Sequence, residues 1–443
     1  MNLLRKQIQT KAYQHAVTKS YLRRNGIYKN QIKKLLHPER KHIRGYTKDE
    51  IITAVIIRHM SPRAYTYLRG NSILPLPSKA SIESYLNKFI VKPGVQTEFL
   101  NMISANLEHG DLHEKQCIIV LDEMEVKKKY EYDRRSKQVF KPHKKVQVVL
   151  VRGLLKSWKQ VIYLGFDSNM TKALLTELIL LCENQGAVVR AVGFDMGNHG
   201  LIKELGVLKN ENFKFTHPTD SSRVIYTICD VPHLVKLFRN HCLDEGFIFN
   251  YGTEEEFTLG KEDFQLLLRN DGADLKLCPK LSSIHINVHG SARQRVRLAT
   301  QIFSKTVSKA MEFQFGELYQ PQCKVVSTVD NWFDTLNSRV KFTTKPLSCG
   351  YGVNLEEQEE ALDEMDLLIQ NMRFANNPES RTKKPFQKGI LVSNKAIRAL
   401  FQDLKGDLEN FEYLLTARCN QDVLENFFSR LRGNFYFILC YKM

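Results

Sequence analysis

Five runs of apolar and β-branched residues follow one another between residues 115 and 235 and predict buried β-strands. The runs are CIIVLD, KVQVVLVRG, KQVIYLGFD, AVVRAVGFD and VIYTICD. Between the third and the fourth lies TKALLTELILLCENQG, which has apolar residues at helical spacing and ends in a glycine typical of a helix C-terminus. Three strands, a helix, a strand, a second helix and a strand predict a mixed α/β sheet.

Asp122, Asp195 and Asp230 each end one of these apolar runs. A carboxylate at the end of a buried strand is costly to desolvate unless a partner, a cation or solvent compensates its charge. Taken singly, each aspartate also fits an ordinary turn or helix-capping role. Asp230 stands one residue before the pair Val231 and Pro232, which is a typical N-cap sequence, so we expect its role to be structural.

Helix-start signals dominate the region that precedes the strands. Thr47 followed by Glu50 has the spacing of a capping box, Ser61 precedes a proline, and Ser78 follows LPLP. These signals predict three short helices, at about 48–59, 62–69 and 79–90. Three compact helices in a basic chain favour a helix-turn-helix module, and a small structural bundle is the alternative, because spacing alone identifies no base-reading side chains.

The apolar pattern changes after residue 246, and the chain up to residue 410 is predicted to be mainly helical. This stretch includes a long acidic helix at 354–374 and a basic linker at 376–389. The last segment, NQDVLENFFSRLRGNFYFILCYKM, begins as an amphipathic helix. Asp422 and Glu425 are three residues apart and share one face of that helix.

The composition of the chain indicates a polyanionic partner. The chain has 443 residues, enough for two or three domains, and 65 Lys and Arg against 48 Asp and Glu give it a formal net charge of +17. Such an excess favours nucleic acid as a partner, and a basic protein without one is the alternative. The basic segment 1–45 fits either a solvated surface or a role in nuclear import and phosphate contact.

Cysteine usage and hydropathy bear on the compartment. The nine cysteines are scattered, with no CxxC pair and no zinc-like Cys/His cluster, as is typical of reduced thiols in an intracellular protein. Charges interrupt the opening residues too often for a signal peptide, and no apolar run approaches the roughly 18 residues of a membrane span. We therefore expect a protein of the cytosol or the nucleus with no membrane partner, and a role of the basic segment in nuclear import would place it in the nucleus.

Asp122, Asp195 and Glu425 are residues of the type that catalyse phosphodiester chemistry. Two-metal catalysis needs several carboxylates that converge on ions about 4 Å apart. Oxygen ligands of this kind suit Mg²⁺. Asp122 and Asp195 would meet if their strands are neighbours, and a helix that carries Glu425 would complete the site.

Eight segments between about residues 45 and 432 connect the chain to a known family. In chain order they are LPLPSKASIESYL, CIIVLDEM, WKQVIYLGFD, GFDMGN, DVPHLVKLFRNH, KLSSIHINVHGSARQRVRLATQIFS, DNWFDTLNSR and QDVLENFFSRLR. These segments resemble the P-element transposases and the related THAP-domain transposases. Several of them are specific to that family, which makes the resemblance strong.

The resemblance implies an α/β fold in which a ribonuclease-H-like mixed sheet is interrupted by a large, mainly helical insertion domain and preceded by a helix-turn-helix module. The expected parts are a basic helical N-terminal segment at 1–45, a helix-turn-helix DNA-binding-like domain at 46–110, the first part of the catalytic domain at 111–245, a GTP-binding insertion at 246–410, and the final catalytic helix with a truncated tail at 411–443.

The family cuts and rejoins DNA at an acidic Mg²⁺ site. Carried over position by position, the resemblance implies that Asp122, Asp195 and Glu425 are catalytic and bind the metal. The first two would bind both ions and Glu425 one of them. Asp422 lies one helical turn before Glu425 and is the fourth acidic position carried over.

The family's insertion binds GTP as a cofactor for assembly with DNA rather than as a fuel. WFDTLN matches its base-reading segment, so that Phe333 would stack on guanine, Asp334 would accept its adjacent N–H donors and Asn337 would support the contact. The remaining cofactor-binding positions carried over are Lys280, Arg295 and Val296, with the arginine in place of an expected lysine. The alternative is that Trp332 and Phe333 are ordinary core aromatics.

The two ends of the chain depart from the family. A THAP transposase begins with a zinc-binding Cys/His domain, and no such cysteine set precedes Tyr46. After FFSRLRG the family continues with a Gly-rich segment, where this chain has NFYFILCYKM. We therefore expect a truncated copy with weak or no autonomous transposition.

Two functions remain open at this point. The first is a P-element-type DNA transposase that performs Mg²⁺-dependent DNA cleavage and strand transfer with GTP as assembly cofactor. The second is a non-catalytic, domesticated or repressor-like protein that binds DNA. The expected partners are transposon-end and target DNA, together with further copies of the chain in a homo-oligomer or a full-length transposase.

Overall fold

The computed structural model describes residues 45–86, 92–133, 138–252, 254–271 and 276–434. The basic segment predicted at 1–45, apart from its last residue, and the tail that follows Asn434 lie outside these residues. The chain divides into two compact units, of which the first holds residues up to Val91 and the second runs from Lys92 to Arg432. Each unit is described by itself.

The first unit contains the three predicted helices. They are α3 (Lys48–Met60), α4 (Pro62–Gly70) and α5 (Lys79–Leu86). Thr47 and Glu50 form the predicted capping box, and the hydroxyl groups of Ser61 and Ser78 accept backbone N–H groups at the starts of the next two helices. Ala54, Tyr65, Leu76 and Ile82 form a small common core. The three helix starts are confirmed.

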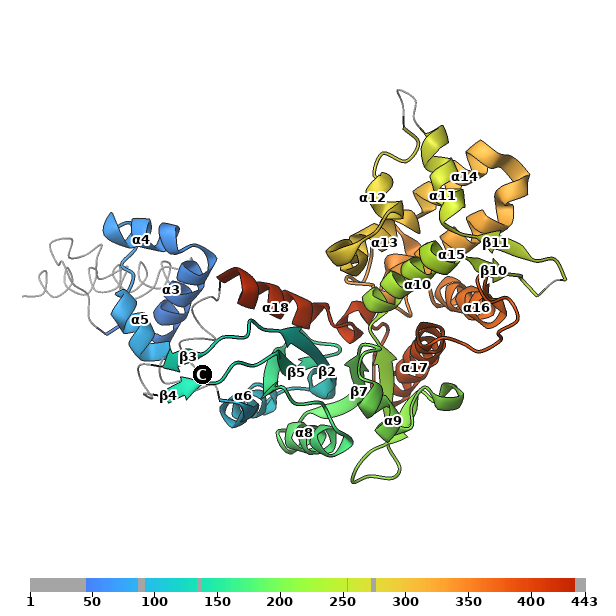
Figure 1. Cartoon of the computed structure of the whole chain (residues 1–443). Coiled ribbons are helices and arrows are strands. Elements are labelled where there is room, and N and C mark those ends of the chain that lie inside the picture. The colour runs from blue at the N-terminus through green and yellow to red at the C-terminus, as the bar shows by residue number, and fades with distance from the viewer. Residues whose placement is uncertain (1–44, 87–91, 134–137, 253, 272–275, 435–443) are drawn as a thin grey trace, which may run out of the picture. The chain divides into compact units, whose positions relative to one another are not determined.

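The second unit is organised around a seven-stranded mixed sheet (Figure 1). In spatial order its strands are β1 (Gly94–Val95), β6 (Lys159–Phe166), β5 (Lys145–Gly153), β2 (Gln116–Glu125), β7 (Val188–Phe194), β9 (Val224–Cys229) and β8 (Lys214–Thr216). The five predicted runs are β2, β5, β6, β7 and β9. The first three of them pair antiparallel, whereas β7 runs parallel to both β2 and β9.

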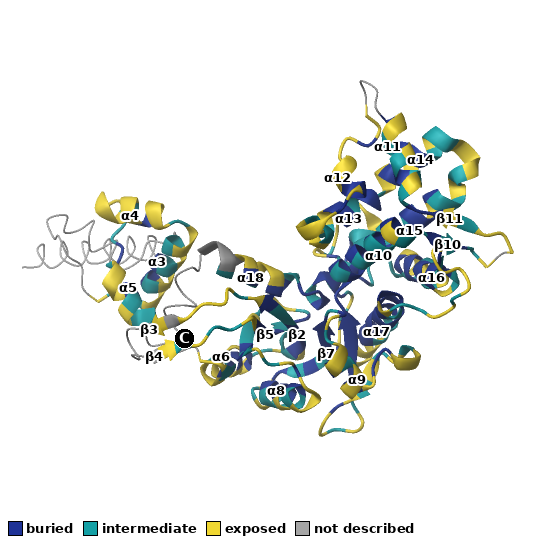
Figure 2. Ribbon diagram, in the orientation of Figure 1, coloured by how far each residue is buried: buried dark blue, intermediate teal, exposed yellow. Residues whose placement is uncertain are grey.

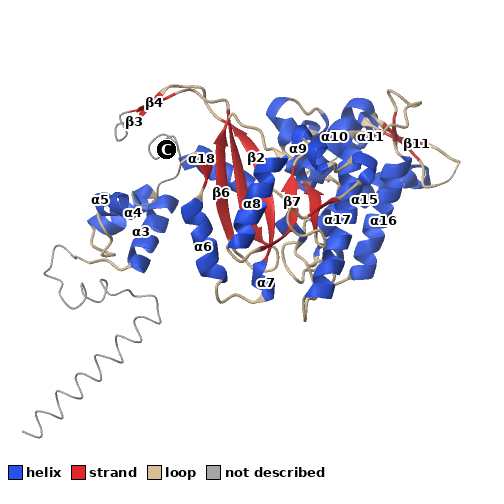
Figure 3. Cartoon of the chain, turned by 90° about the horizontal axis from the view of Figure 1, so that it is seen from below, coloured by secondary structure: helices blue, strands red, loops and turns tan. Residues whose placement is uncertain are grey.

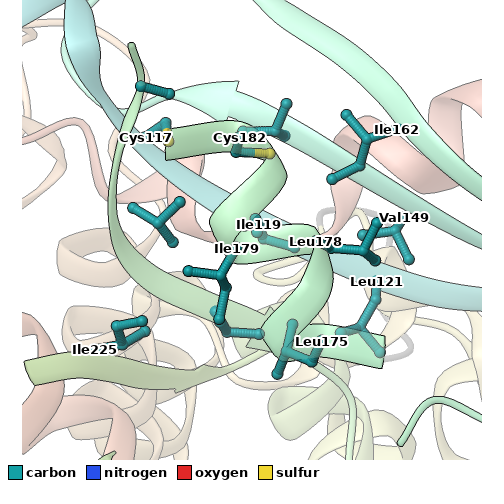
Figure 4. Packing of buried hydrophobic residues seen from close by; sticks show 14 of the residues in the cluster. Cys117, Ile119, Leu121, Val149, Ile162, Leu175, Leu178, Ile179, Cys182 and Ile225 are labelled. Atoms are coloured by element: carbon teal, nitrogen blue, oxygen red, sulfur yellow. The ribbon is translucent and has the colours of Figure 1, made fainter. Parts of the chain in front are cut away.

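Alternation of side chains along the strands gives this sheet two apolar faces. One face packs against α6 (Thr97–Leu107) and α8 (Lys172–Asn184), where Leu121, Val149 and Leu178 belong to one buried cluster (Figure 4). Both helices lie on the side of the sheet opposite α18 (Asp422–Asn434) (Figure 3). The predicted second helix is α9 (His199–Leu205).

The other face of the sheet is covered by α17 (Pro385–Asp407), which packs against β9 and also against α10 (Val231–Glu245). The segment that leads into α18 crosses the same face. Gly193 in β7 permits this approach, because a Cβ atom there would lie only 3.0 Å from the carbonyl oxygen of Cys419 and from Val120 Cγ1. Figure 2 shows that the strands and α17 are mostly buried.

Between β9 and α18 the chain is mainly helical, as predicted. The main helices after α10 are α11 (Lys261–Asn270), α12 (Ser283–Ile286), α13 (Val296–Ile302), α14 (Lys305–Phe315), α15 (Gln320–Leu336), α16 (Leu355–Asn371) and α17. A small sheet is formed by β11 (Phe257–Leu259), β10 (Phe247–Phe249) and β12 (Arg373–Phe374). Phe238 of α10 contacts the rings of Phe247, Phe303 and Phe386, which gives this region an aromatic core.

The structure differs from the sequence-based expectation in three local details. β2 continues to Glu125, so Asp122 lies inside the strand and not at its end. The acidic helix stops at Asn371, because Arg373 and Phe374 pair with β10. α17 begins at Pro385, inside the segment interpreted as a linker. None of the described helices is long and apolar enough to cross a membrane.

Candidate active site and nucleotide-binding segment

Asp122 and Asp195 are level with each other on neighbouring parallel strands. Val120 of β2 is paired with Gly193 of β7, and each aspartate follows two residues later. Partners in a parallel pair point to the same face of the sheet, so both aspartates belong to the face that Gly193 opens toward Cys419. The expectation that their strands are neighbours is confirmed.

Asp195 ends its strand in a tight turn. Its Oδ1 accepts the backbone N–H of Gly197, at 3.0 Å, and the side-chain amide of Asn198, at 2.8 Å. Asn198 then begins α9 as its N-cap. The residues GFDMGN therefore form a tight turn that holds Oδ1 of Asp195 in place.

Helix α18 brings Glu425 to the same face. The side-chain amide of Gln421, just before the helix, donates to the carbonyl oxygen of Leu121, the residue before Asp122. The backbone N–H of Glu425 donates to the carbonyl oxygen of Gln421 at 3.1 Å, and its Oε1 lies 3.9 Å from Nζ of Lys236 on α10. Residues about 300 positions apart are thus joined directly.

The electrostatics of Asp122 reflect this arrangement. The pKa of its carboxyl group is raised from 3.8 to about 7, mainly by burial and to a smaller extent by the negative charges of Asp195, Asp230 and Glu425, while a hydrogen bond from the N–H of Glu123 opposes the rise. A carboxyl group whose pKa is raised by burial and by neighbouring carboxylates is typical of functional sites.

Asp230 is the predicted N-cap of α10 and has a second role. Its Oδ2 accepts the N–H of His233 at 3.0 Å, which confirms the cap, and its Oδ1 accepts the N–H of Gln421 at 2.8 Å. The side chain is 3% exposed, and burial raises its pKa to about 7. Asp230 therefore ties the end of β9 to the segment that begins α18.

Asp422 lies on α18 but is engaged elsewhere. Its carboxylate is 2.9 Å from Arg339 and 3.8 Å from Arg152 on β5. The structure thus places Asp195 and Glu425 within electrostatic range of Asp122 and pairs Asp422 with two arginines. Within the described parts of the chain, no three Asp, Glu, His or Cys side chains converge closely enough to hold a metal ion as they are placed.

The donor chemistry nevertheless suits a divalent cation. The three side chains offer only carboxylate oxygens, which are ligands that Mg²⁺ prefers. A cation near Asp122 would offset the repulsion and the desolvation that raise the pKa of its carboxyl group.

The segment WFDTLN forms the end of α15. Trp332 is fully buried and donates its indole N–H to Asn394 at 2.8 Å, so it is the core aromatic that the alternative interpretation expected. Phe333 and Asp334 are half-buried, and Asp334 forms an ion pair with Lys345 at 2.8 Å. Asn337 caps the helix C-terminus. Phe333, Asp334 and Asn337 lie within about one turn of each other on this helix.

The expected phosphate-binding positions lie on other elements. Lys280 is exposed in the loop before α12, and Arg295 is exposed at the start of α13, where Val296 is the first helical residue. α13 packs against α15. In the part of the chain that the structure describes, no hydrogen bond or ion pair joins Lys280 or Arg295 to the three residues on α15.

Sequence reasoning missed the residues that support these sites. They are Lys236, Asp330, Lys345, Gln421 and, as a link to α18, Asp230. Asp330 precedes Asp334 by one turn of α15, and burial followed by the charge of Asp334 raises its pKa. Asp230 carried its N-cap signal, which did not indicate the link to α18, and Asp330 carried the spacing of four residues from Asp334. The other contacts are made between distant segments.

Comparisons with known proteins agree with this geometry. Residues 91–206 match a family described as TNP-like, RNase H N-terminal domain, and residues 232–348 match a family described as TNP-like, GTP-binding insertion domain. The second match begins in α10 and ends after α15. It therefore includes the residues expected to read guanine.

Individual relatives give the same result. The Transposable element P transposase of Drosophila melanogaster is 32% identical over 400 residues, which are 88% of this chain and 51% of the relative. DNA transposase THAP9 of Homo sapiens is 24% identical over 415 residues, or 84% and 44% of the two chains. This chain thus spans about half the length of these two curated relatives.

A solved structure is similar over nearly the whole chain. The Drosophila P element transposase strand transfer complex superposes with a TM-score of 0.80 and 30% sequence identity. The match covers 95% of this chain and 93% of that chain. The ribonuclease-H-like fold with a GTP-binding insertion is confirmed.

Proposed function

Because the chain belongs to the P element transposase family, we propose that it acts as a P-element-type DNA transposase, which cleaves DNA and joins DNA strands with Mg²⁺ and uses GTP as an assembly cofactor. The observation that carries this proposal is the placement of three carboxylates from distant segments: Asp122 on β2 and Asp195 just after β7 lie on neighbouring strands, and Gln421, one turn before Glu425, donates to the carbonyl oxygen of Leu121.

In this proposal the carboxylates of Asp122, Asp195 and Glu425 would hold the metal ions. Mg²⁺, when bound, supplies positive charge that stabilises the oxygen atoms of the reacting phosphate. Water attacks the phosphorus in the cleavage step and a DNA 3′-hydroxyl in strand transfer, and each attack forms one P–O bond and breaks another. The Asp195 turn and the hydrogen bond from Gln421 to the Leu121 carbonyl orient the carboxylates beforehand.

The nucleotide is proposed to bind at the end of α15. Phe333 stacks on the guanine, Asp334 accepts its N–H groups and Asn337 supports the contact, while Lys280, Arg295 and the start of α13 at Val296 face the phosphates. The ion pair with Lys345 keeps Asp334 close to a cation before the nucleotide arrives, and it must loosen when guanine donors take its place.

The proposed partners follow from the charge of the chain and from its family. DNA is the expected polyanion for a formal net charge of +17. We propose that α3, α4 and α5 form a helix-turn-helix module for DNA, that the protein acts as a homo-oligomer or with a full-length transposase, and that it works in the nucleus. The location of a fluorescent fusion in cells tests the last point.

A cleavage assay tests the catalytic proposal. The purified chain is incubated with labelled single- and double-stranded DNA, with Mg²⁺ and then with EDTA. Asp195→Ala is expected to lower the Mg²⁺-dependent rate by about 10³-fold, in the range typical of losing a group that stabilises the transition state. Asp220→Ala is the matched control, since Asp220 lies in an exposed turn and its carboxylate accepts hydrogen bonds from Ser222.

Activity that survives Asp195→Ala unchanged would overturn the assignment. Salt-sensitive DNA binding without any turnover would instead favour the non-catalytic alternative, because binding through phosphate contacts weakens linearly on a logarithmic salt scale.

A further inference from the structure

The end of α15 is joined to the segment before α18 by hydrogen bonds in the protein interior. The N–H of Ser338 donates to Oγ1 of Thr416 at 3.0 Å, and the N–H of Thr416 donates to Oγ of Ser338 at 3.1 Å. The Thr416 hydroxyl donates to the Thr335 carbonyl oxygen at 2.8 Å. Thr335, Ser338 and Thr416 are at most 1% exposed.

A second set of contacts lies beside the first. The side-chain amide of Asn420 donates to the Leu336 carbonyl oxygen at 3.2 Å and to Oδ1 of Asn337 at 3.3 Å. Asn420 is 1% exposed. We name the contacts of Ser338, Thr416 and Asn420 the α15–α18 clasp. Buried polar groups are costly to leave unpaired, so the two segments move together.

The clasped segment is fixed on its other side to the catalytic sheet. Gln421 follows Asn420 directly, and it donates its backbone N–H to Oδ1 of Asp230 and its side-chain amide to the carbonyl oxygen of Leu121. Glu425 follows one turn later, with its N–H bonded to the carbonyl oxygen of Gln421. Residues 416–421 thus form a short bridge from α15 to Glu425.

The α15 end of this bridge is also the segment proposed to read guanine. Asn337 belongs to both, because its Oδ1 accepts from Asn420 while its position on the helix is one turn from Asp334. A nucleotide that orders Phe333, Asp334 and Asn337 would therefore order the bridge as well. Such a coupling needs no new contact at the carboxylates.

We propose that Ser338, Thr416 and Asn420 are positioning residues, through which a guanine nucleotide bound at the end of α15 fixes Glu425 opposite Asp122. This inference rests on the proposed function, since it requires nucleotide binding at α15. Under this proposal the nucleotide determines the position of Glu425 as well as assembly with DNA.

Hydrogen exchange measured by mass spectrometry tests the coupling without requiring DNA cleavage. The full chain is compared without nucleotide, with GTP and with ATP, and binding is measured separately with a fluorescent GTP analogue. GTP is expected to slow exchange in peptides that cover residues 416–428 by about 10-fold, whereas ATP leaves it unchanged because adenine presents different groups to Asp334.

Three substitutions separate positioning from general stability. Thr416→Val removes the hydroxyl at nearly constant volume and is expected to keep GTP affinity within about 3-fold while losing the protection of 421–428. Thr416→Ser restores a hydroxyl and is expected to restore the protection. Thr328→Val is the matched control, since Thr328 is equally buried on α15 but its hydroxyl bonds to Glu364, outside the clasp.

Asn420→Ala provides an independent variant if Thr416→Val does not fold. It removes only two long hydrogen bonds, and Oδ1 of Asn420 has no partner among the described residues, so the substitution leaves fewer groups unpaired. It is expected to lose the same protection.

Two results would overturn the coupling and leave the proposed function standing. The first is GTP binding with no change in exchange at 416–428. The second is equal protection in wild type, Thr416→Val and Asn420→Ala. Absence of GTP binding in the wild-type chain would overturn both the cofactor assignment and this inference.

Discussion

The carboxylates of Asp122 and Asp230 at the large sheet differ from those of Asp334 and Asp422 on helices α15 and α18 in how their charge is balanced. Asp122 is half-buried and Asp230 is buried, and in the described structure no Lys, Arg or His forms an ion pair with either of them. Asp334 and Asp422 lie on helices, where Lys345 is paired with the first and Arg339 with the second.

Ion-paired and unpaired carboxylates have different effects on the stability of the fold. A carboxylate paired with a cation is already balanced, and an exposed pair changes stability little when it is removed. A buried carboxylate without a cation destabilises the fold when ionised, which raises its pKa. The sheet carboxylates thus cost stability in the absence of a ligand, as is common at functional sites.

Removal of Asp230 is expected to have the largest effect on stability, because its carboxylate also accepts two backbone hydrogen bonds. Asp230→Ala leaves the N–H groups of His233 and Gln421 without their acceptors. We expect the free energy of unfolding to fall by about 3 kcal/mol, the order expected for losing a helix cap and a buried acceptor together. Urea unfolding at pH 6 measures it.

Asp230→Asn is the control for charge. It keeps one of the two oxygen acceptors and removes the ionisable group, so we expect a loss of about 1–2 kcal/mol, smaller than that of Asp230→Ala. Equal losses in the two variants would mean that one remaining acceptor gives no stability, and that the hydrogen bonds from His233 and Gln421 are needed together.

A divalent cation should stabilise the carboxylates at the large sheet and not the ion-paired carboxylates of Asp334 and Asp422. Mg²⁺ at 100 times its dissociation constant is expected to stabilise the protein by about 2.7 kcal/mol. The midpoint of thermal unfolding, measured with Mg²⁺ and with EDTA, reports this effect. Asp122→Asn should abolish the shift, whereas Asp422→Asn should leave most of it; a shift of equal size in both variants would place the cation elsewhere.

The sheet itself was predictable because each strand carries its own signal. Runs such as KVQVVLVRG and VIYTICD are apolar on both faces and are bounded by turns, so their type and their approximate ends follow from local sequence. The pairing of β2 with β7 does not follow from either strand alone. The family resemblance supplied it, and the register of Val120 with Gly193 confirms it.

Asp122→Asn should stabilise the metal-free protein. The pKa of this carboxyl group is about 7 in the folded chain and near 3.8 when unfolded, so the folded state binds more protons between these values and loses stability as the pH rises from about 4 to about 7. We expect the variant to be more stable by about 2 kcal/mol at pH 8 and by almost nothing below pH 4.

Urea unfolding in EDTA across this pH range checks the expectation. Asp220→Asn, in an exposed turn, is the control. A variant that is no more stable than wild type at pH 8 would show that Asp122 is not destabilised by its neighbours, and the contrast with the paired carboxylates would disappear.

The contacts around the candidate sites were less predictable than the carboxylates themselves. Asp195 could be identified because a charge follows an apolar run, and its turn is written in the neighbouring residues of GFDMGN. Gln421 and Thr416 carry no comparable signal, because their partners lie about 300 and 78 positions away in the chain. Polar residues of this kind acquire a role only from tertiary contacts.

The smallest effect on stability is expected from Asp334 in the insertion, whose charge is already balanced by Lys345. Asp334→Asn removes an ion pair whose lysine is 61% exposed, so the free energy of unfolding should fall by only about 0.5 kcal/mol. The affinity for a fluorescent GTP analogue should nevertheless fall by about 10–100-fold, because an amide both accepts and donates where guanine needs an acceptor. Glu312→Gln loses a similar exposed pair, with Lys309, and should leave GTP affinity unchanged. Equal GTP affinity in wild type and Asp334→Asn would show that the charge of Asp334 serves only its pair with Lys345, and the carboxylates at the insertion would then differ from those on the sheet in function as well as in charge balance.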